Sequence, residues 1–494
     1  MIDRTGRRAY QVGDQEFIVD SRFQLINRVG HGSFGIICSA RYRGSVGEES
    51  GSNVLLAVKK IPHALHDPVY TKRSLRELKL LRFFQGHHNV VNLFDADLVY
   101  DSDGNFNGLY LYEELLDCDL GQIIRSRQPL TDYHFQSFIY QTLCGLKFIH
   151  SAGVLYRDLK PGCLLITEDC HLKISDFGLA RGYSVDPSEN SQFTTEYVAT
   201  RWYRAPEIML NYGDYSTAID VWSVGCILAE LLLGEPLFKG SDYVNQLNRM
   251  LQILGTPDME TLQLISSPNV RNYILALGLV PKTPLNLIFP SASEGALDLL
   301  GKLLKFNPRE RITVDEALDH SYLAIWHAEG EEPVCFERPD FDFEKSYDMV
   351  GLKDLLSQEV ESFRELVRQP FYPSELQPFS PSDEQEFTSV EGEEEREKEA
   401  ELPYLREYMT EVFSQPSVTP STSNIRNEEP YQRETRPSGA ESEGTQSAPQ
   451  VGIQSTSIPK RTTPMVRFPI IRTTGFNLSS YNKRDTKTKK KKKK

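Results

Sequence analysis

The sequence contains few cysteines, and no two of them occur at the short spacing of a paired motif. Its seven cysteines are scattered singly through 494 residues, without a Cys-x-x-Cys string or a Cys-rich block. Small secreted domains that depend on disulfides leave a denser and more regular pattern. We therefore expect reduced thiols and a cytosolic or nuclear protein.

Long apolar segments are also lacking. The first residues, Met1–Arg8, contain no apolar core of the kind that a signal peptide needs. The most apolar later stretch, Ile219–Leu233, is interrupted by Asp220 and Glu230. A membrane-spanning helix needs about 20 predominantly apolar residues. We therefore expect neither a signal peptide nor a membrane span.

The formal net charge of −14 gives little information about partners once it is located along the chain. Residues 383–401 contain ten acidic and two basic residues, so this segment alone carries a net charge of −8. More than half of the excess acid therefore lies in one segment, and the rest of the chain is only mildly acidic. This balance gives no reason to expect direct binding to nucleic acid.

The chain divides into four parts by its residue pattern. Residues 1–22 are expected to form a short leader. From 23 to 323, helical and strand patterns alternate with short Gly, Pro and Asn punctuation, which is typical of a packed domain. Residues 324–371 keep an amphipathic pattern that predicts a helix packing back on that domain. The remainder, 372–494, is rich in Ser, Thr, Pro, Glu and Gln, and we expect a disordered tail.

A glycine-rich string lies between two apolar runs near the start of the packed domain. Its pattern predicts a strand–turn–strand loop, in which backbone N–H groups approach phosphate oxygens without a Cβ in the way. On its own this pattern is weak, because an ordinary hairpin explains it equally well. The string consists of Gly30, His31, Gly32, Ser33, Phe34 and Gly35.

Two charged residues downstream give the glycine loop a chemical context. Lys59 ends the strand-like string Ala57–Lys59 and supplies a positive charge for the α- and β-phosphates of a nucleotide. Residues 72–81 have a helical pattern that places Glu77 where it can pair with Lys59 and keep it aimed at the phosphates. A lysine at a strand end is usually only solvated, but the presence of both residues argues against that interpretation.

Three strings between residues 154 and 207 carry the strongest chemical signal. In order, they match the catalytic loop, the metal loop and the substrate-platform anchor of eukaryotic protein kinases, and they are Val154–Cys163, Asp176–Gly178 and Ala205–Glu207. Asp158 would accept or orient the proton of the attacking hydroxyl, and Lys160 would neutralise charge on the phosphoryl group. Asp176 offers carboxylate oxygens, which are ligands that Mg²⁺ prefers.

Several longer strings carry a resemblance to a known family. From about residue 23 to 370 the chain resembles the MAP kinases, and specifically the fungal MAP kinases of the cell-wall-integrity pathway. Besides the glycine loop, the strings that carry it are Tyr110–Leu115, Gln192–Leu210 and Asp242–Asn248. The resemblance implies an α+β, bilobal protein kinase fold with a small β-rich N-terminal lobe and a large helical C-terminal lobe. It also implies ATP and Mg²⁺ as cofactors, and phosphorylation of Ser or Thr followed by Pro.

The resemblance also implies which residues contact the nucleotide. Backbone groups of Glu114 and Leu116 would hydrogen-bond the edge of the base, and Asp119 would reach the ribose. Further residues that the resemblance places in the nucleotide site are Ile37, Ala57 and Leu165.

Activation by phosphorylation of both Thr195 and Tyr197 is implied as well. Physical reasoning supports this, because a phosphate on Thr195 carries close to two negative charges and needs cationic partners. If the segment were an ordinary polar loop, the arginines that surround it in the family would have no anionic partner there. The candidates for the first phosphate are Arg76, Arg157 and Arg181, and those for the second are Arg201 and Arg204.

Two positions and one segment depart from the family pattern. Tyr156 stands where histidine is usual, and its aromatic ring with a polar tip is expected to fill the same packing site. Cys163 stands where the pattern has an asparagine that binds a second Mg²⁺ and tethers Asp158. A thiol is a soft ligand that Mg²⁺ does not favour, so we expect catalysis to suffer. Residues 328–332 keep negative charge in the docking patch without its usual aspartates, which leaves its affinity for basic peptides open.

Two functional hypotheses therefore remain open from the sequence. The first is an active Ser/Thr MAP kinase with one Mg²⁺ at Asp176, and intact Lys59, Glu77 and Asp158 favour it. The second is a catalytically weak pseudokinase that acts as a phosphorylation-switched docking protein, and Cys163 favours it. Under the first, the expected partners are an upstream dual-specificity MAP kinase kinase, phosphatases, and protein substrates such as transcription regulators.

The chain ends in a basic run, Lys489–Lys494, that follows Lys483, Arg484 and Lys487. Such a run serves as a nuclear-import signal or contacts an anionic surface, and the alternative is a solvated chain end. We expect the protein to shuttle between cytoplasm and nucleus.

Overall fold

The structure is a computed structural model, and it describes residues 6–32, 35–42, 54–183, 200–210, 216–328, 330 and 332–367. Ser33 and Phe34 of the predicted glycine loop lie outside the described residues. Both predicted phosphorylation sites, Thr195 and Tyr197, and the predicted tail also lie outside them.

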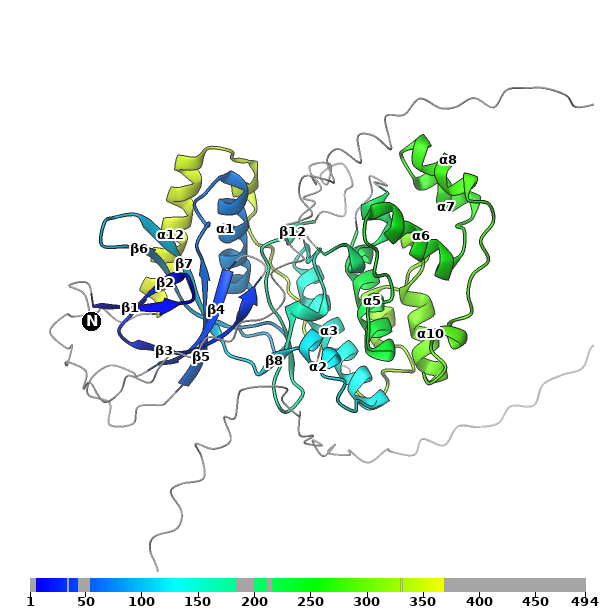
Figure 1. Ribbon diagram of the computed structural model, residues 1–494, viewed down its shortest axis with the longest axis horizontal. Coiled ribbons are helices and arrows are strands. Elements are labelled where there is room, and N and C mark those ends of the chain that lie inside the picture. The colour runs from blue at the N-terminus through cyan, green and yellow to red at the C-terminus, as the bar shows by residue number, and fades with distance from the viewer. Residues whose placement is uncertain are drawn as a thin grey trace, which may run out of the picture. The chain divides into compact units, whose positions relative to one another are not determined.

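The first part of the fold contains a five-stranded antiparallel sheet with the strand order β3–β4–β5–β7–β6 (Figure 1). Its strands are β3 (Phe23–Gly32), β4 (Gly35–Tyr42), β5 (Val54–Ile61), β6 (Leu93–Tyr100) and β7 (Phe106–Glu114). In this register Ile37 lies opposite Lys59, and Glu114 lies opposite Leu56, the neighbour of Ala57. The pairing therefore gathers residues of the predicted nucleotide site from three adjacent strands.

Helices α1 (Pro68–Phe83) and α12 (Met349–Val367) lie beside each other, and α12 also contacts β6 (Figure 1). The first turn of α1 is capped by Asp67, whose carboxylate accepts hydrogen bonds from the N–H groups of Val69 and Tyr70. The buried face of α12 consists of Leu352, Leu356, Val360 and Phe363. The end of the described chain thus packs on the same part of the fold as its beginning.

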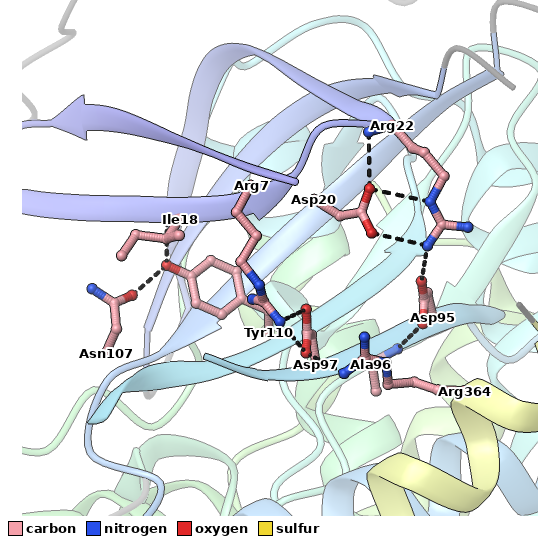
Figure 2. Close-up of polar contacts among 10 residues, drawn as sticks. All are labelled: Arg7, Ile18, Asp20, Arg22, Asp95, Ala96, Asp97, Asn107, Tyr110 and Arg364. Carbon is pink, nitrogen blue, oxygen red and sulfur yellow. Dashed lines mark hydrogen bonds and ion pairs between the residues drawn. The ribbon is translucent and has the colours of Figure 1, made fainter. Parts of the chain in front are cut away.

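The residues expected to be a short leader form a hairpin of two antiparallel strands, β1 (Arg7–Val12) and β2 (Gln15–Asp20). Val12, Phe17 and Val19 are completely buried, so the hairpin adds to the hydrophobic core. The hairpin is also joined to β7, because the N–H of Ile18 donates a hydrogen bond of 3.0 Å to the hydroxyl of Tyr110 (Figure 2). The sequence of residues 1–22 gave no signal that this segment would pack against the sheet.

Asp97 on β6 connects the two ends of the described chain (Figure 2). Its completely buried carboxylate lies 2.9 Å from Arg7 of the hairpin and 2.7 Å from Arg364 of α12. A second ionic group lies nearby, where Asp20 accepts hydrogen bonds of 3.1 Å from the guanidinium of Arg22. Arg22 also lies 4.0 Å from Asp95 on β6, so this second group joins the end of the hairpin to the sheet.

The second part of the fold is helical, and α5 (Ala218–Leu233) is buried along most of its length between α3 (Asp132–Ser151) and α10 (Glu294–Leu303). α5 ends at Gly234, whose left-handed backbone (φ +79°) suits glycine. The other helices are α2 (Leu120–Arg125), α4 (Pro206–Met209), α6 (Tyr243–Leu254), α7 (Met259–Leu264), α8 (Pro268–Ala276), α9 (Leu285–Ile288) and α11 (Val314–Leu318). Within the described ranges, none of the helices has both the length and the apolar character needed to cross a membrane.

Short strands hold the loops that join the two parts. β8 (Cys118–Asp119), β10 (Leu164–Ile166) and β11 (Leu172–Ile174) form one small sheet, and β9 (Val154–Leu155) pairs with β12 (Arg181–Gly182). Single 3-10 turns cover Pro161–Cys163, Arg201–Tyr203, Pro308–Glu310 and Asp342–Lys345. The predicted α+β architecture, a small β-rich part followed by a large helical part, is confirmed.

Candidate active site

Lys59 lies at the centre of a buried ionic cluster. Its ammonium donates a hydrogen bond to Oε1 of Glu77 on α1 and lies 3.7 Å from Oδ1 of Asp176. Burial alone would lower the pKa of Lys59, but the charges of Asp176, Glu77 and Glu113 outweigh it and raise the pKa above its usual value. Lys59 is therefore a fixed positive charge, and the two residues that the sequence pairs are in contact.

The described part of the glycine loop comes close to neighbouring backbone. At Gly35, a Cβ would lie only 1.9 Å from the carbonyl oxygen of Lys60, so a residue with a side chain does not fit there. At Gly30, a Cβ would meet no atom of the described residues within 4 Å, so among these residues the loop has open space on that side. The backbone of Gly32 pairs with that of Gly35 and closes the hairpin. His31 directly precedes this pair in the loop. This geometry fits a backbone cradle for phosphate oxygens.

The residues expected to contact base and ribose lie where β7 ends and α2 begins. Leu116 is buried just after Glu114, the last residue of β7. Asp119 caps α2, because its Oδ1 accepts a hydrogen bond of 2.8 Å from the N–H of Gln122. Leu165 on β10 lies opposite Asp119 in the small sheet. Oδ1 of Asp119 is thus already hydrogen-bonded to the first turn of α2. This is the residue that is expected to contact the ribose.

The catalytic loop holds Asp158 against Lys160. The Nζ of Lys160 lies 2.6 Å from Oδ2 of Asp158, and both side chains are largely buried. Burial raises the pKa of the Asp158 carboxyl, while Lys160 acts in the opposite direction. The backbone is strained at two points of the site, since Arg157 (φ +72°) and Asp176 (φ +63°) are non-glycine residues in the left-handed region. Strain of this kind persists only where surrounding contacts hold it in place.

Asp220 on α5 supplies those contacts for the catalytic loop. Its carboxylate is completely buried and accepts hydrogen bonds from the N–H groups of Tyr156 at 2.9 Å and Arg157 at 2.8 Å. His150 Nε2 lies 2.8 Å from the same carboxylate. Sequence reasoning missed this role, although an acidic residue inside the apolar stretch 219–233 was a usable signal. Asp220 is therefore a positioning residue for the loop.

Tyr156 links the catalytic loop to the metal loop. Its hydroxyl donates a hydrogen bond of 3.0 Å to the carbonyl oxygen of Asp176 and also contacts the carbonyl oxygen of Ser175. Its ring packs edge-on against Phe177, with centroids 5.5 Å apart. A polar tip bonded to backbone and a buried ring match the packing role expected at this position.

Cys163 is buried behind the catalytic loop as a neutral thiol. Its Sγ lies 3.7 Å from the carbonyl oxygen of Asp158 and donates a weak hydrogen bond to it. Burial raises the pKa of Cys163 to about 12, so the thiolate that would bind a metal is not formed at neutral pH. The donor set fits Mg²⁺ at the carboxylate of Asp176 and does not fit it at Cys163. The neutral thiol therefore agrees with the expectation that Cys163 is a poor ligand for Mg²⁺.

Two arginines expected to bind phosphate meet at Glu344, in the segment before α12. The completely buried Arg76 on α1 donates from Nε to Glu344 Oε1 at 2.6 Å, and it also donates to the carbonyl oxygen of Gly178. Arg181 Nη1 lies 4.0 Å from the same Glu344 oxygen. Arg157 directly precedes Asp158 in the strained catalytic loop. Sequence reasoning missed Glu344, because its contact with Arg76 spans 268 positions.

The remaining two predicted arginines lie near the start of α6. Arg201 donates a hydrogen bond of 2.6 Å to the carbonyl oxygen of Ser241, and the guanidinium of Arg204 donates to the hydroxyl of Tyr243. Arg76 and Arg181 thus lie beside Glu344, whereas Arg201 and Arg204 lie beside α6.

Two acidic residues that the sequence analysis singled out form ion pairs within the fold. Glu207 of the Ala-Pro-Glu string forms two hydrogen bonds with Arg311, at 2.6 and 3.0 Å. Glu332 of the predicted docking patch is turned inward and lies 3.1 Å from Lys147 and 2.8 Å from His327. Its charge is therefore engaged within the fold, while Glu329 and Glu331 lie outside the described residues.

Comparison with known proteins accounts for this arrangement. Residues 23–323 match the family model of the protein kinase domain. Over 370 residues the chain is 60% identical to "Mitogen-activated protein kinase SLT2/MPK1" of Saccharomyces cerevisiae, which covers 75% of each chain. The chain belongs to the MAP kinases.

Two further relatives agree with this assignment. "Mitogen-activated protein kinase MKC1" of Candida albicans is 54% identical over 377 residues, covering 74% of this kinase and 75% of the relative. "Mitogen-activated protein kinase mpkA" of Aspergillus fumigatus is 54% identical over 369 residues, covering 75% and 85%. The predicted membership in this fungal group and the Ser/Thr kinase function are confirmed, and the comparisons give no support to the pseudokinase alternative.

Proposed function

We propose that this MAP kinase transfers the γ-phosphoryl group of ATP, bound with Mg²⁺, to Ser or Thr residues followed by Pro. The observation that carries the proposal is the meeting of Lys59, Glu77 and Asp176, with Lys59 3.7 Å from Asp176. A phosphate-binding cation and a metal-binding carboxylate are needed side by side in phosphoryl transfer. The Asp158–Lys160 pair at 2.6 Å adds a group for the attacking hydroxyl and one for the phosphoryl charge.

Each group has a separate task. Lys59 binds the α- and β-phosphates, and Glu77 keeps it aimed. Asp176 would hold Mg²⁺, which would supply positive charge to neutralise the phosphates. Asp158 orients the hydroxyl of the substrate, and Lys160 stabilises negative charge on the oxygens of the transferred group. Because Cys163 offers a neutral thiol in place of an oxygen ligand, the kinase is expected to work with weaker charge neutralisation and a lower rate.

Phosphorylation of Thr195 and Tyr197 by an upstream dual-specificity kinase is proposed as the switch. The proximity of Arg76 and Arg181 supports it, because a carboxylate already attracts both and a phosphate with nearly two charges competes better. A Thr195→Ala, Tyr197→Phe double variant should lose stimulated activity, measured after incubation with the upstream kinase. Undiminished activity would count against this switch.

The cellular context follows from the same proposal. Transcription regulators are the expected class of substrate, phosphatases would reverse the switch, and the kinase would move between cytoplasm and nucleus. The basic run 483–494 is the proposed import signal. A tagged chain without these residues should stay out of the nucleus under stress, and an unchanged distribution would refute the signal.

The decisive experiment is a kinase assay with the purified, dually phosphorylated chain, ATP, Mg²⁺ and a Ser/Thr-Pro peptide. Asp158→Asn serves as the control that removes the group for the attacking hydroxyl. Peptide phosphorylation that disappears in the control supports the proposal. Phosphate incorporation equal in both proteins, or absent from both, contradicts it.

A further inference from the structure

Glu113 extends into the nucleotide site from the face of the sheet that carries Lys59. Residues directly opposite on neighbouring antiparallel strands project to the same face, as do residues two apart on one strand. Glu113 lies opposite Ala57 on β5 and opposite Leu93 on β6, and Lys59 is two residues from Ala57. The carboxyl is also close enough for its charge to raise the pKa of Lys59. The side chain therefore faces the same site as Lys59.

The carboxyl of Glu113 is buried without a complete set of hydrogen bonds. Glu113 is 7% exposed, and its Oε1 is inaccessible and has no hydrogen-bond partner in the described part of the chain. A buried polar atom without a partner destabilises a fold, and most buried polar atoms in folded proteins are hydrogen-bonded. The ammonium of Lys59 is engaged with Glu77 instead. The free oxygen thus needs a group that arrives with a ligand.

The position of Glu113 identifies the part of the ligand that it would meet. Glu114 and Leu116, the expected backbone contacts to the edge of the base, follow it directly in the sequence. An amino group at position 6 of a purine has two N–H donors, and a single backbone carbonyl satisfies only one of them. Glu113, on the inner side of the same strand end, offers an acceptor for the other. Burial raises the pKa of Glu113 to about 8, and a neutral carboxyl still accepts through its carbonyl oxygen.

We propose that Glu113 is a specificity-determining residue that accepts a hydrogen bond from the 6-amino group of the adenine base. The inference rests on the proposed use of ATP and deepens it. A purine with hydrogen at position 6 cannot form this bond. Glu113 thus favours a 6-aminopurine nucleotide over a purine nucleotide with hydrogen at position 6 in the same pocket.

The test compares two nucleotides in the full chain by calorimetry, ATP and purine riboside 5′-triphosphate, which lacks the 6-amino group. In Glu113→Leu, ATP should bind roughly fivefold more weakly, as expected for one hydrogen bond. Purine riboside triphosphate should bind within about twofold of wild type, because it never used the bond. Glu113→Gln keeps an acceptor oxygen and should retain most of the preference for ATP.

Tyr112→Phe is the matched control, because Tyr112 lies in the same strand with its side chain on the opposite face. It should leave the ratio of the two affinities unchanged. An equal loss of both nucleotides in Glu113→Leu would overturn the inference, because it would mean that Glu113 acts by positioning Lys59. A changed ratio in Tyr112→Phe would overturn it as well. A wild-type chain that binds neither nucleotide would reject the proposed function itself, whereas ATP binding with equal ratios in all variants would reject only the role of Glu113.

Discussion

The site has a sheet side and a loop side, and the two differ in how complete they are. On the sheet side, Lys59 is bonded to Glu77 and carries a charge that its neighbours reinforce. On the loop side, Asp158 and Asp176 offer carboxylates, but Cys163 presents a neutral thiol that bonds to backbone. The nucleotide-holding half of the site is therefore intact, while the half that neutralises the reacting phosphate has lost an oxygen ligand.

This difference separates binding from turnover. Interactions that are equally strong before and during the reaction improve binding alone, and only those that strengthen in the transition state raise the rate. Lys59, Glu77 and the glycine loop act on the bound nucleotide, so affinity for ATP should be ordinary for this site. Cys163 acts where charge develops, so its effect should appear in kcat.

Asp158→Asn should produce the largest effect, because it removes the group that handles the proton of the attacking hydroxyl. We expect kcat to fall by about 10²- to 10⁴-fold, with little change in ATP affinity, measured by steady-state assay and calorimetry. Asp103→Asn, at an exposed turn, is the matched control and should be silent. A weakened ATP affinity without a change in kcat would contradict the proposal that the sheet side controls binding and the loop side controls turnover.

Glu77→Gln should have the next largest effect, because Lys59 then loses its charged partner and Asp176 is the nearest remaining carboxylate. Diverting Lys59 toward Asp176 disturbs both phosphate binding and the metal site. We expect kcat/KM for ATP to fall about 10- to 100-fold, as misplacement of a binding group can do. Wild-type values for both ATP affinity and kcat would mean that the sheet side does not need this pair.

Cys163→Asn should repair the loop side by supplying an amide oxygen for a second Mg²⁺. We expect kcat to rise about tenfold, which corresponds to only ~1.4 kcal/mol of transition-state stabilisation. The comparison is made across a Mg²⁺ titration, where the variant should gain a second metal dependence. Cys170→Asn is the matched control, because asparagine tolerates the left-handed backbone (φ +64°) found there. Identical rates and identical Mg²⁺ curves for wild type and Cys163→Asn would remove Cys163 as the limiting defect.

A pH effect on stability should be the smallest, and it tests a contact between the segment after α1 and helix α3. His87 follows α1 and stacks on Phe148 of α3, and burial, with the charges of His88 and Lys173, lowers its pKa to about 4. The unfolded chain binds the proton near pH 6.5, so this contribution to stability is complete above pH 6.5 and is lost as the pH falls toward 4. Between pH 7 and pH 5 we expect a loss of about 1–2 kcal/mol in the free energy of unfolding.

Urea unfolding of His87→Asn should show a smaller loss than wild type over the same pH interval. Asparagine still offers an acceptor for the N–H of Asn89, which donates to His87 in the structure. His88→Asn, at an exposed neighbouring position, should keep most of the wild-type pH dependence. The same slope in wild type and His87→Asn would show that other groups control acid stability.

Much of the site could be read from the sequence because its chemistry is local. The strings around Asp158 and Asp176 have fixed spacing, and the helical pattern that places Glu77 toward Lys59 extends over only a few turns. The small β-rich and large helical parts also follow from strand and helix patterns that repeat within a few residues. Where the signal is periodic or motif-like, the sequence is sufficient.

The contacts that sequence reasoning missed join distant segments through single polar side chains. Glu344 meets Arg76 across 268 positions, and Asp220 reaches two backbone N–H groups of a loop 63 and 64 positions away. Glu113 looked like an ordinary strand residue, because no pattern distinguishes a buried carboxyl from an exposed one. Side-chain direction and partner identity depend on the assembled fold, and no local pattern encodes them.

The carboxylate of Asp97 has a consequence for where this protein can be shortened. The segment shared with the protein kinase domain model is 23–323, yet Arg7 and Arg364, which flank that segment, both pair with this one acid. Leaving a buried charge with fewer partners typically destabilises a protein by several kcal/mol, and loss of the hairpin would also uncover the apolar surface beneath Phe17 and Val19. The smallest piece that folds independently therefore extends past the shared segment in both directions, and trimming one end should loosen the other.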